Sequence, residues 1–111
     1  MALPNSEQAV VDIIKIRDYC LNPEHRRGQY KARVFAAALG LTSEHAELLR
    51  QELLSAARTH QATPTEQDNY GQRYQIEFTI TGPNGQQATI RSGWIVRRGE
   101  NFARLTTCYV L

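Results

Sequence analysis

The chain has 111 residues, which is enough for one domain with a single hydrophobic core and leaves no room for a second. No stretch reaches the roughly 18 consecutive apolar residues of a membrane span, and the first residues lack the pattern of a secretory leader, so we expect a cytoplasmic protein without a membrane partner. The net charge is only +2, but eleven of the thirteen cations are arginine, the side chain that pairs with two phosphate oxygens at once.

Three helices are predicted in residues 1–60: from about residue 12 to residue 22, from Tyr30 to Leu39, and from Thr42 or Ser43 to near His60. In the first of them, Ile13, Ile16 and Cys20 recur at helical spacing. This helix ends before Pro23, because the residue that precedes a proline avoids the helical conformation. Gly40 is suited to cap the second helix.

A strongly basic run joins the first two helices. It holds one imidazole and four cations without a carboxylate: His25, Arg26, Arg27, Lys31 and Arg33. Such a run is either a solvated helix entrance or a site for an anion. A second group of arginines after Tyr70 and an acidic stretch over residues 41–70 polarise the charge, which favours phosphate as the partner. Tyr30, inside the run, offers a ring on which a nucleobase can stack.

The second half of the chain has the period of β-strands. Residues 61–71 are polar, contain Pro64 and Gly71, and are predicted to form a linker within the domain. Beyond the linker, apolar and polar residues alternate, which predicts strands over residues 73–80, 88–97 and 104–111 and turns at 82–85 and 99–101. The sequence therefore predicts one α+β domain over residues 1–111, with a helical half (1–60) packed on one face of an antiparallel meander (72–111) of three to four strands.

Alternation assigns the strand side chains to two faces of the sheet. The core face is predicted to carry the large apolar side chains: Tyr74, Ile76, Phe78, Ile80, Ile90, Trp94, Val96, Leu105 and Leu111. Tyr109 falls on the core face by parity. The other face gathers a carboxylate, two guanidiniums and a hydroxyl: Glu77, Arg91, Arg104 and Thr106. That face is either a solvated surface with cross-strand ion pairs or a chemical site, and a slip of one residue would exchange the two faces.

The two cysteines and the absence of known motifs argue against a zinc site, a disulfide scaffold and the enzyme classes that such motifs define. Cys20 and Cys108 lack both the spacing of a zinc site and the density of a disulfide scaffold, so we expect reduced thiols that pack in the core. The sequence contains no glycine-rich phosphate loop, no zinc-peptidase motif and no hydrolase nucleophile motif. We therefore expect neither a metal ion nor a cofactor.

The candidate residues match the needs of RNA cleavage by the ribose 2′-hydroxyl, which requires a base, an acid and cations for the charge that grows on phosphorus. His25 can act as acid or base, since imidazole titrates near neutrality, and Glu77 can act as a base. Cations that can hold the phosphate are Lys31, Arg33, Arg91 and Arg104, and hydroxyls come from Thr106 and Tyr109.

Five segments spread over nearly the whole chain resemble one bacterial domain family: residues 18–25, 31–35, 38–42, 70–74 and 104–111. That family is catalogued as a domain of unknown function. Similar domains occur alone near small antitoxin-like genes and at the C-terminal ends of larger bacterial toxin and phage proteins. The resemblance therefore implies a toxin whose partner is a small cognate antitoxin or immunity protein.

A second resemblance is more distant. Helices followed by an antiparallel sheet, with polar residues on the last strand, are similar to the metal-independent ribonuclease superfamily that includes barnase, the RelE toxins and colicin RNases. That resemblance implies polar catalytic groups at six positions: His25, Lys31, Arg33, Arg104, Thr106 and Tyr109.

Two classes of function remain open. In the first, the chain is a ribonuclease toxin with RNA as its substrate. Its predicted catalytic residues are His25, Glu77, Arg91, Arg104, Thr106 and Tyr109. Its predicted RNA-binding residues are Arg26, Arg27, Tyr30, Lys31 and Arg33. In the second class, the chain is a non-catalytic module that docks on nucleic acid or on a protein.

Overall fold

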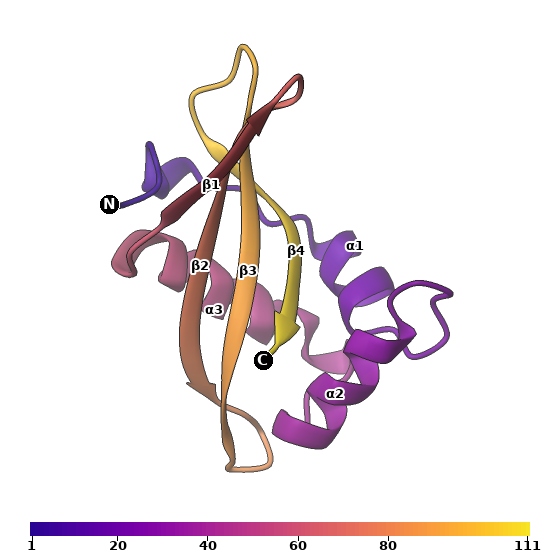
Figure 1. Cartoon of the computed structure of the whole chain (residues 1–111). Coiled ribbons are helices and arrows are strands. Elements are labelled where there is room, and N and C mark those ends of the chain that lie inside the picture. Colours follow the sequence, from indigo (N-terminus) through magenta and orange to yellow (C-terminus); the bar gives the residue numbers. More distant parts are fainter.

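Four antiparallel strands form one sheet in the order β1-β2-β3-β4 in the computed structural model, which describes all residues 1–111 (Figure 1). The strands are β1 (Thr63–Asp68), β2 (Gly71–Thr81), β3 (Gln87–Arg97) and β4 (Ala103–Val110). Helices occupy the N-terminal half of the chain, as predicted. The predicted α+β class and the antiparallel sheet of three to four strands are confirmed.

The helices follow the predicted boundaries closely. They are α1 (Ile13–Lys15), which continues into the π-helical turn η2 (Ile16–Cys20), α2 (Gln29–Leu39) and α3 (Ala46–Thr59), with two short 3₁₀ turns, η1 (Ser6–Gln8) and η3 (Ser43–His45). Asp12 caps α1 by accepting from the backbone N–H of Ile14, and Gly40 ends α2 in a left-handed conformation. No helix is both long enough and apolar enough to cross a membrane.

The helices are distributed unevenly around the sheet. α3 crosses one face, here called the inner face, while α1, η2 and α2 lie beside the edge strand β4 (Figure 1). The opposite, outer face carries no helix. We call the group formed by α1, η2, the loop 21–28 and α2 the helical corner. This arrangement brings the basic run next to β4.

The core lies between the inner face and the helices. Its largest wholly buried side chains include Phe35 from α2 and Trp94 from β3, and the core position predicted for Trp94 is confirmed. The Trp94 indole N–H donates to the Ser92 hydroxyl at 2.9 Å, and that hydroxyl donates to the Ile76 carbonyl at 2.9 Å. The buried polar atoms of this layer therefore have partners, as a buried polar group requires.

The predicted linker over residues 61–71 is wrong in part, because it contains β1. All six residues of β1 are exposed, so the strand has no apolar alternation that the sequence could reveal. It forms by pairing with the edge of β2, with Thr63 opposite Gln75 and Asp68 opposite Gly71. The meander therefore has four strands and begins at Thr63, nine residues earlier than the boundary of 72 predicted from the sequence.

A bulge in β4 changes which side chains face outward. Gly93 pairs with Thr107 and the next residue, Trp94, pairs with Leu105, so Thr106 is an extra residue in the ladder. Beyond the bulge the parity of β4 is reversed. Tyr109 lies opposite Arg91 on the outer face. The core positions predicted for Tyr109 and Leu111 are thus wrong, and Leu111 is 56% exposed while Cys108 is wholly buried.

Candidate functional site

Arginines on the outer face of the sheet are held by carboxylates. Arg91 forms an ion pair with Glu77 at 2.6 Å, and Arg104 forms one with Glu100 at 2.9 Å. Glu77 and, to a smaller extent, the Tyr109 hydroxyl raise the pKa of Arg91, and hydrogen bonding from Arg104 lowers the pKa of Glu100. The predicted outer-face neighbours Glu77 and Arg91 therefore do come together.

Arg104 is placed apart from this pair. Its partner across the ladder is Ile95, four residues along β3 from Arg91, which corresponds to about 13 Å of strand. Arg104 instead donates to both carboxylate oxygens of Glu100 from its own end of β4. The four side chains predicted to form one polar cluster are thus divided. Glu77 and Arg91 form one ion pair, Arg104 forms another with Glu100, and Thr106 belongs to neither.

Cations without a carboxylate partner gather on the helical corner. Five side chains of this group form no ion pair: Lys15, Arg26, Arg27, Lys31 and Arg33. The only other unpaired cations are Arg58, Arg97 and Arg98. A cation that has no fixed carboxylate is free to bind an external anion, so the helical corner is the part of the molecule best suited to phosphate.

Lys31 connects the helical corner to the sheet. Its ammonium donates to the Thr107 hydroxyl at 2.9 Å and lies 3.4 Å from the Tyr19 hydroxyl. The same ammonium lies 5.3 Å from the centre of the Tyr19 ring and 5.5 Å from that of Tyr109, within the range of a cation–π contact. Lys15 also donates to the Thr106 carbonyl at 3.3 Å. The basic run therefore reaches the outward-facing side of β4.

His25 stabilises the loop that leads into α2. Its Nδ1 accepts from the backbone N–H groups of Arg27 and Gly28, at 3.0 Å each, and its ring packs edge-on against Tyr19 with 4.8 Å between ring centres. Because Nδ1 is an acceptor here, the neutral ring carries its proton on Nε2. His25 lines a cleft of about 560 Å³ whose walls include Lys15, Tyr19 and Thr106.

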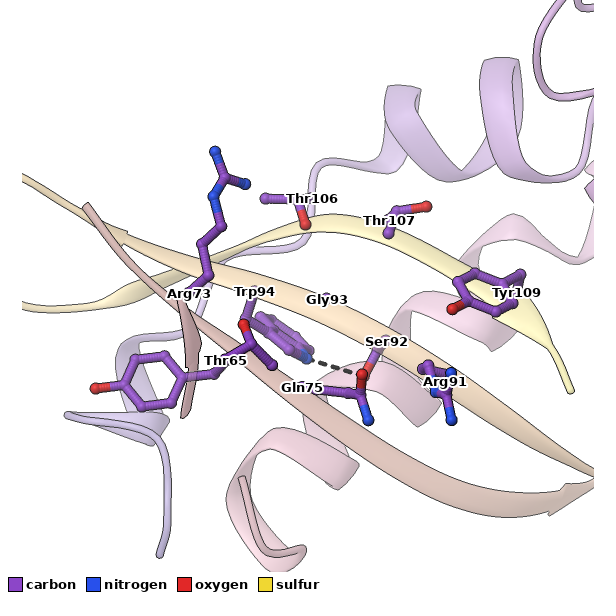
Figure 2. Close-up of a pocket in the computed structure, with 11 residues that line it drawn as sticks. Thr65, Arg73, Gln75, Arg91, Ser92, Gly93, Trp94, Thr106, Thr107 and Tyr109 are labelled. Carbon is purple, nitrogen blue, oxygen red and sulfur yellow. Dashed lines mark hydrogen bonds between the residues drawn. The ribbon is translucent and has the colours of Figure 1, made fainter. Parts of the chain in front are cut away.

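A smaller hollow lies on the outer face of the sheet. It measures about 140 Å³ and is lined by residues of all four strands, Arg91, Gly93, Thr106, Thr107 and Tyr109 among them. Figure 2 shows the two threonines and Tyr109 in succession along β4, with the bare backbone of Gly93 on the neighbouring strand. A Cβ at Gly93 would lie 3.0 Å from the Thr106 hydroxyl oxygen, so glycine keeps this hollow open.

Thr106 is the residue that these cavities share. It lines the His25 cleft, the Gly93 hollow and a third cleft of about 130 Å³ that contains Arg104. No single cavity contains His25, Arg91 and Arg104 together. We call the group around Thr106 the junction site, and it consists of Lys15, Tyr19, His25, Lys31, Thr106, Thr107 and Tyr109.

The other predicted residues lie at the border of the junction site. Arg26 and Arg27 are exposed in the loop before α2, and Tyr30 and Arg33 lie on α2, with the guanidinium 5.8 Å from the ring centre. Sequence reasoning missed Lys15, Tyr19 and Thr107. The first two are four residues apart in a predicted helix, which was a usable sign that they share a face. The roles predicted for all site residues stay predictions.

No three His, Cys, Asp or Glu side chains come together in an arrangement that could hold a metal ion. The two thiols lie elsewhere, wholly buried between η2 and β4, with 3.7 Å between the sulfurs of Cys20 and Cys108. The junction site therefore offers an imidazole, two ammonium groups, two tyrosines and two threonine hydroxyls, and the carboxylates of Asp12 and Asp18 also line the His25 cleft.

Comparisons with known proteins place the chain in a family and a fold. The model of a family described as a domain of unknown function (DUF6883) matches residues 2–111. No curated protein matches the sequence. Among solved structures, the fold is similar to that of a chain in a contact-dependent growth inhibition toxin–immunity protein complex from Klebsiella pneumoniae 342, with a TM-score of 0.72 and 18% identity over 92% of this chain and 99% of that chain.

Proposed function

This chain belongs to the DUF6883 family, a domain of unknown function, and we propose that it is a toxin domain that cleaves RNA through its own side chains. The similar fold in a complex of a toxin and an immunity protein supports the toxin role and a small immunity protein as inhibitor. The observation that carries the proposal is Lys31, a cation without a carboxylate partner that bonds to Thr107 between two tyrosine rings.

The proposed reaction is attack by the ribose 2′-hydroxyl on the adjacent phosphate. The 2′-oxygen loses its proton to a base and bonds to phosphorus, while the bond from phosphorus to the 5′-oxygen breaks and that oxygen takes a proton from an acid. The products are a 2′,3′-cyclic phosphate and a 5′-hydroxyl. Negative charge grows on the phosphoryl oxygens, so cations fixed beside them stabilise the transition state.

The junction site and the neighbouring Gly93 hollow offer candidate groups for proton transfer and for contacts with the phosphate. His25 is assigned to proton transfer through Nε2, since its Nδ1 is engaged by the loop backbone. Lys31 is assigned to the phosphoryl oxygens, and the hydroxyls of Thr106 and Tyr109 can donate to them as well. Arg91 uses only two of its N–H groups on Glu77, which leaves donors for a phosphate in the Gly93 hollow.

The remaining predicted residues are assigned to supporting roles. Arg26, Arg27 and Arg33 would bind neighbouring phosphates of the RNA. Glu77 and Arg104 lie in ion pairs on either side of Thr106. Glu77 remains the second candidate for the base, and Arg104 for a phosphate contact from the third cleft.

A non-catalytic RNA-binding module is the second candidate function. The hydrogen bonds of His25 favour it, because a ring that holds the loop before α2 through Nδ1 has a structural role that needs no chemistry. The same free cations would then bind phosphate without cleaving it. The two candidates differ in one measurable respect, which is whether RNA is cut.

The test compares cleavage of mixed RNA by the wild type and by His25→Asn and Lys31→Ala, in the presence of a chelator. Asn keeps an acceptor for the loop N–H groups while it removes the titratable ring and the edge-on contact of that ring with Tyr19. We expect the wild type to cut RNA and leave 2′,3′-cyclic phosphate ends. Each variant should cut about 10²-fold more slowly or worse. Arg58→Ala is the matched control, since it removes an unpaired cation from the exposed side of α3.

Thermal unfolding of every variant must match the wild type for the comparison to count. An inactive wild type, freed of any immunity protein, would reject the ribonuclease assignment. So would folded His25→Asn and Lys31→Ala variants that cut as fast as Arg58→Ala. RNA binding without cleavage would leave the binding module as the function.

A further inference from the structure

An apolar groove runs between α2 and the end of β4, next to the junction site. Tyr30 and Val34, one helical turn apart on α2, line one side, and Tyr109 and Val110 of β4 line the other. Lys31 of α2 also lines the groove. The groove measures about 280 Å³. Pockets for drug-sized ligands start at about 300 Å³, so this groove fits one flat ring system better than a folded peptide segment.

The groove is exposed although its walls are apolar. Tyr30 is 67% exposed and Val34 is 45% exposed, so neither is needed to fill the core. Exposed aromatic and aliphatic side chains that line one concave surface are a common sign of a binding site. The groove can therefore bind a ligand that has an apolar face.

Charge selects the kind of ligand. Lys31 lies inside the groove and the Arg33 guanidinium covers the Tyr30 ring at 5.8 Å, while no carboxylate occurs anywhere from residue 25 to residue 43. A protein that docks here would have to bring carboxylates to satisfy these cations. A nucleotide carries both an aromatic base, which suits the apolar walls of the groove, and a phosphate, which suits its cations.

Two residues connect the groove to the proposed reaction. Tyr109 lines both the groove and the Gly93 hollow, and Lys31 lines the groove while it bonds to Thr107 in the junction site. A nucleotide whose phosphate lies at Lys31 therefore has its base within reach of the groove. The sugar would then lie near Thr107.

We propose that this groove is the nucleobase subsite of the enzyme, and that it holds one unstacked base of single-stranded RNA against Tyr30. The proposal rests on the proposed function for the identity of the ligand. In it Tyr30 contributes stacking, Val34 and Val110 contribute apolar contact, and Lys31 binds the phosphate of the same nucleotide. Base stacking then makes the groove selective for single-stranded RNA. Duplex RNA is excluded, because its bases are already stacked on one another.

The experiment separates stacking from charge. All proteins carry His25→Asn, so that RNA is cut too slowly to disturb the measurement. Binding is measured by fluorescence anisotropy with a labelled single-stranded RNA octamer and with an abasic ribose-phosphate octamer of the same charge. Tyr30→Ala should weaken RNA binding about tenfold, within the range found for one stacked base, and should leave abasic binding unchanged. Tyr70→Ala is the matched control, because Tyr70 is 72% exposed in the turn between β1 and β2.

Two results would overturn the subsite. Equal weakening of both octamers by Tyr30→Ala would mean that the residue acts through charge or folding. No weakening of either would leave the groove to a protein partner such as the immunity protein. The proposed function fails separately: a wild type that does not cut RNA, combined with the stacking effect at Tyr30, rejects catalysis and keeps the base groove.

Discussion

At Gly28 the loop before α2 passes close to the backbone of η2. A Cβ at this position would lie 2.0 Å from the Tyr19 carbonyl oxygen, which is backbone and has no room to move aside. The N–H of Gly28 also donates to His25. One small residue therefore fixes the distance between two members of the junction site, Tyr19 and His25.

We predict that Gly28→Ala damages both stability and activity. The added methyl group has to push the loop away from η2, and overpacking of this kind costs about 1–3 kcal/mol of unfolding free energy. Cleavage should fall further than this loss of folded protein explains, because His25 and Tyr19 separate. Chemical denaturation and cleavage rates, measured below the unfolding transition, check the two effects, and a variant with wild-type values in both would show that the loop is free to adjust.

The sequence identified part of the junction site, for reasons that are visible residue by residue. His25 and Lys31 could be identified because the basic run contains no carboxylate, and the charge of a segment follows directly from its residue types. Thr106 and Tyr109 were named on the assumption of an unbroken strand, and they reach the site for a different reason, the bulge. Thr107 could not be found, because nothing in the alternation of β4 marks which threonine is the extra one.

At the scale of elements, the fold was predictable wherever a segment buries one face. α2, α3, β2 and β3 each show a clear apolar period. α2, β2 and β3 were predicted within about two residues, and α3 begins at Ala46, after the 3₁₀ turn η3 at the predicted start. β1 shows none, since it contributes hydrogen bonds and no buried side chain. A strand of that kind is defined by its neighbour, so the sequence of residues 63–68 alone could not reveal it.

The contact between η2 and β4 depends on two thiols. The Cys108 thiol donates to the Cys20 sulfur at 3.7 Å, and both side chains are wholly buried. The neighbouring Cys20 and burial together raise the pKa of Cys108, while the same hydrogen bond lowers the pKa of Cys20. The expected reduced, packed thiols are confirmed as free cysteines.

We predict that neither thiol reacts with a chromogenic disulfide reagent while the protein is folded. Reaction needs an accessible thiolate, and both sulfurs lie in the core with no path for the reagent. The number of thiols that react per chain should be near zero in buffer and two after denaturation in guanidinium. A rapid reaction of one thiol under native conditions would mean that η2 opens away from β4.

For the whole molecule, the unequal placement of paired and unpaired cations predicts how binding responds to salt. Three arginines of the outer face, Arg73, Arg91 and Arg104, are paired with carboxylates, whereas the helical corner carries five cations without partners. Binding of single-stranded RNA should therefore release counterions mainly at the helical corner, and affinity should fall steeply as salt rises.

The dependence of RNA affinity on salt concentration can be measured as a slope. In a plot of log affinity against log salt, each neutralised phosphate contributes about −0.7 for a single strand, so Lys31→Ala should reduce the slope by roughly that amount. Arg58→Ala should leave the slope as it is. Titrations of the octamer at four salt concentrations check both values, and an affinity that does not depend on salt would show that phosphate is not the main contact.

The two edges of the sheet differ in a way that limits self-assembly. The edge of β4 is occupied, because Val10 exchanges backbone hydrogen bonds with Ala103 and Leu105 and the helical corner lies beside the rest. The outer edge of β1 pairs with no other strand. Only Pro64 and the charges of Glu66 and Asp68 disfavour the addition of a further strand there. A sheet with one open edge can add one partner and no more. Pairing between copies, if it occurred through β1, would close as a twofold dimer and could not propagate into a fibril.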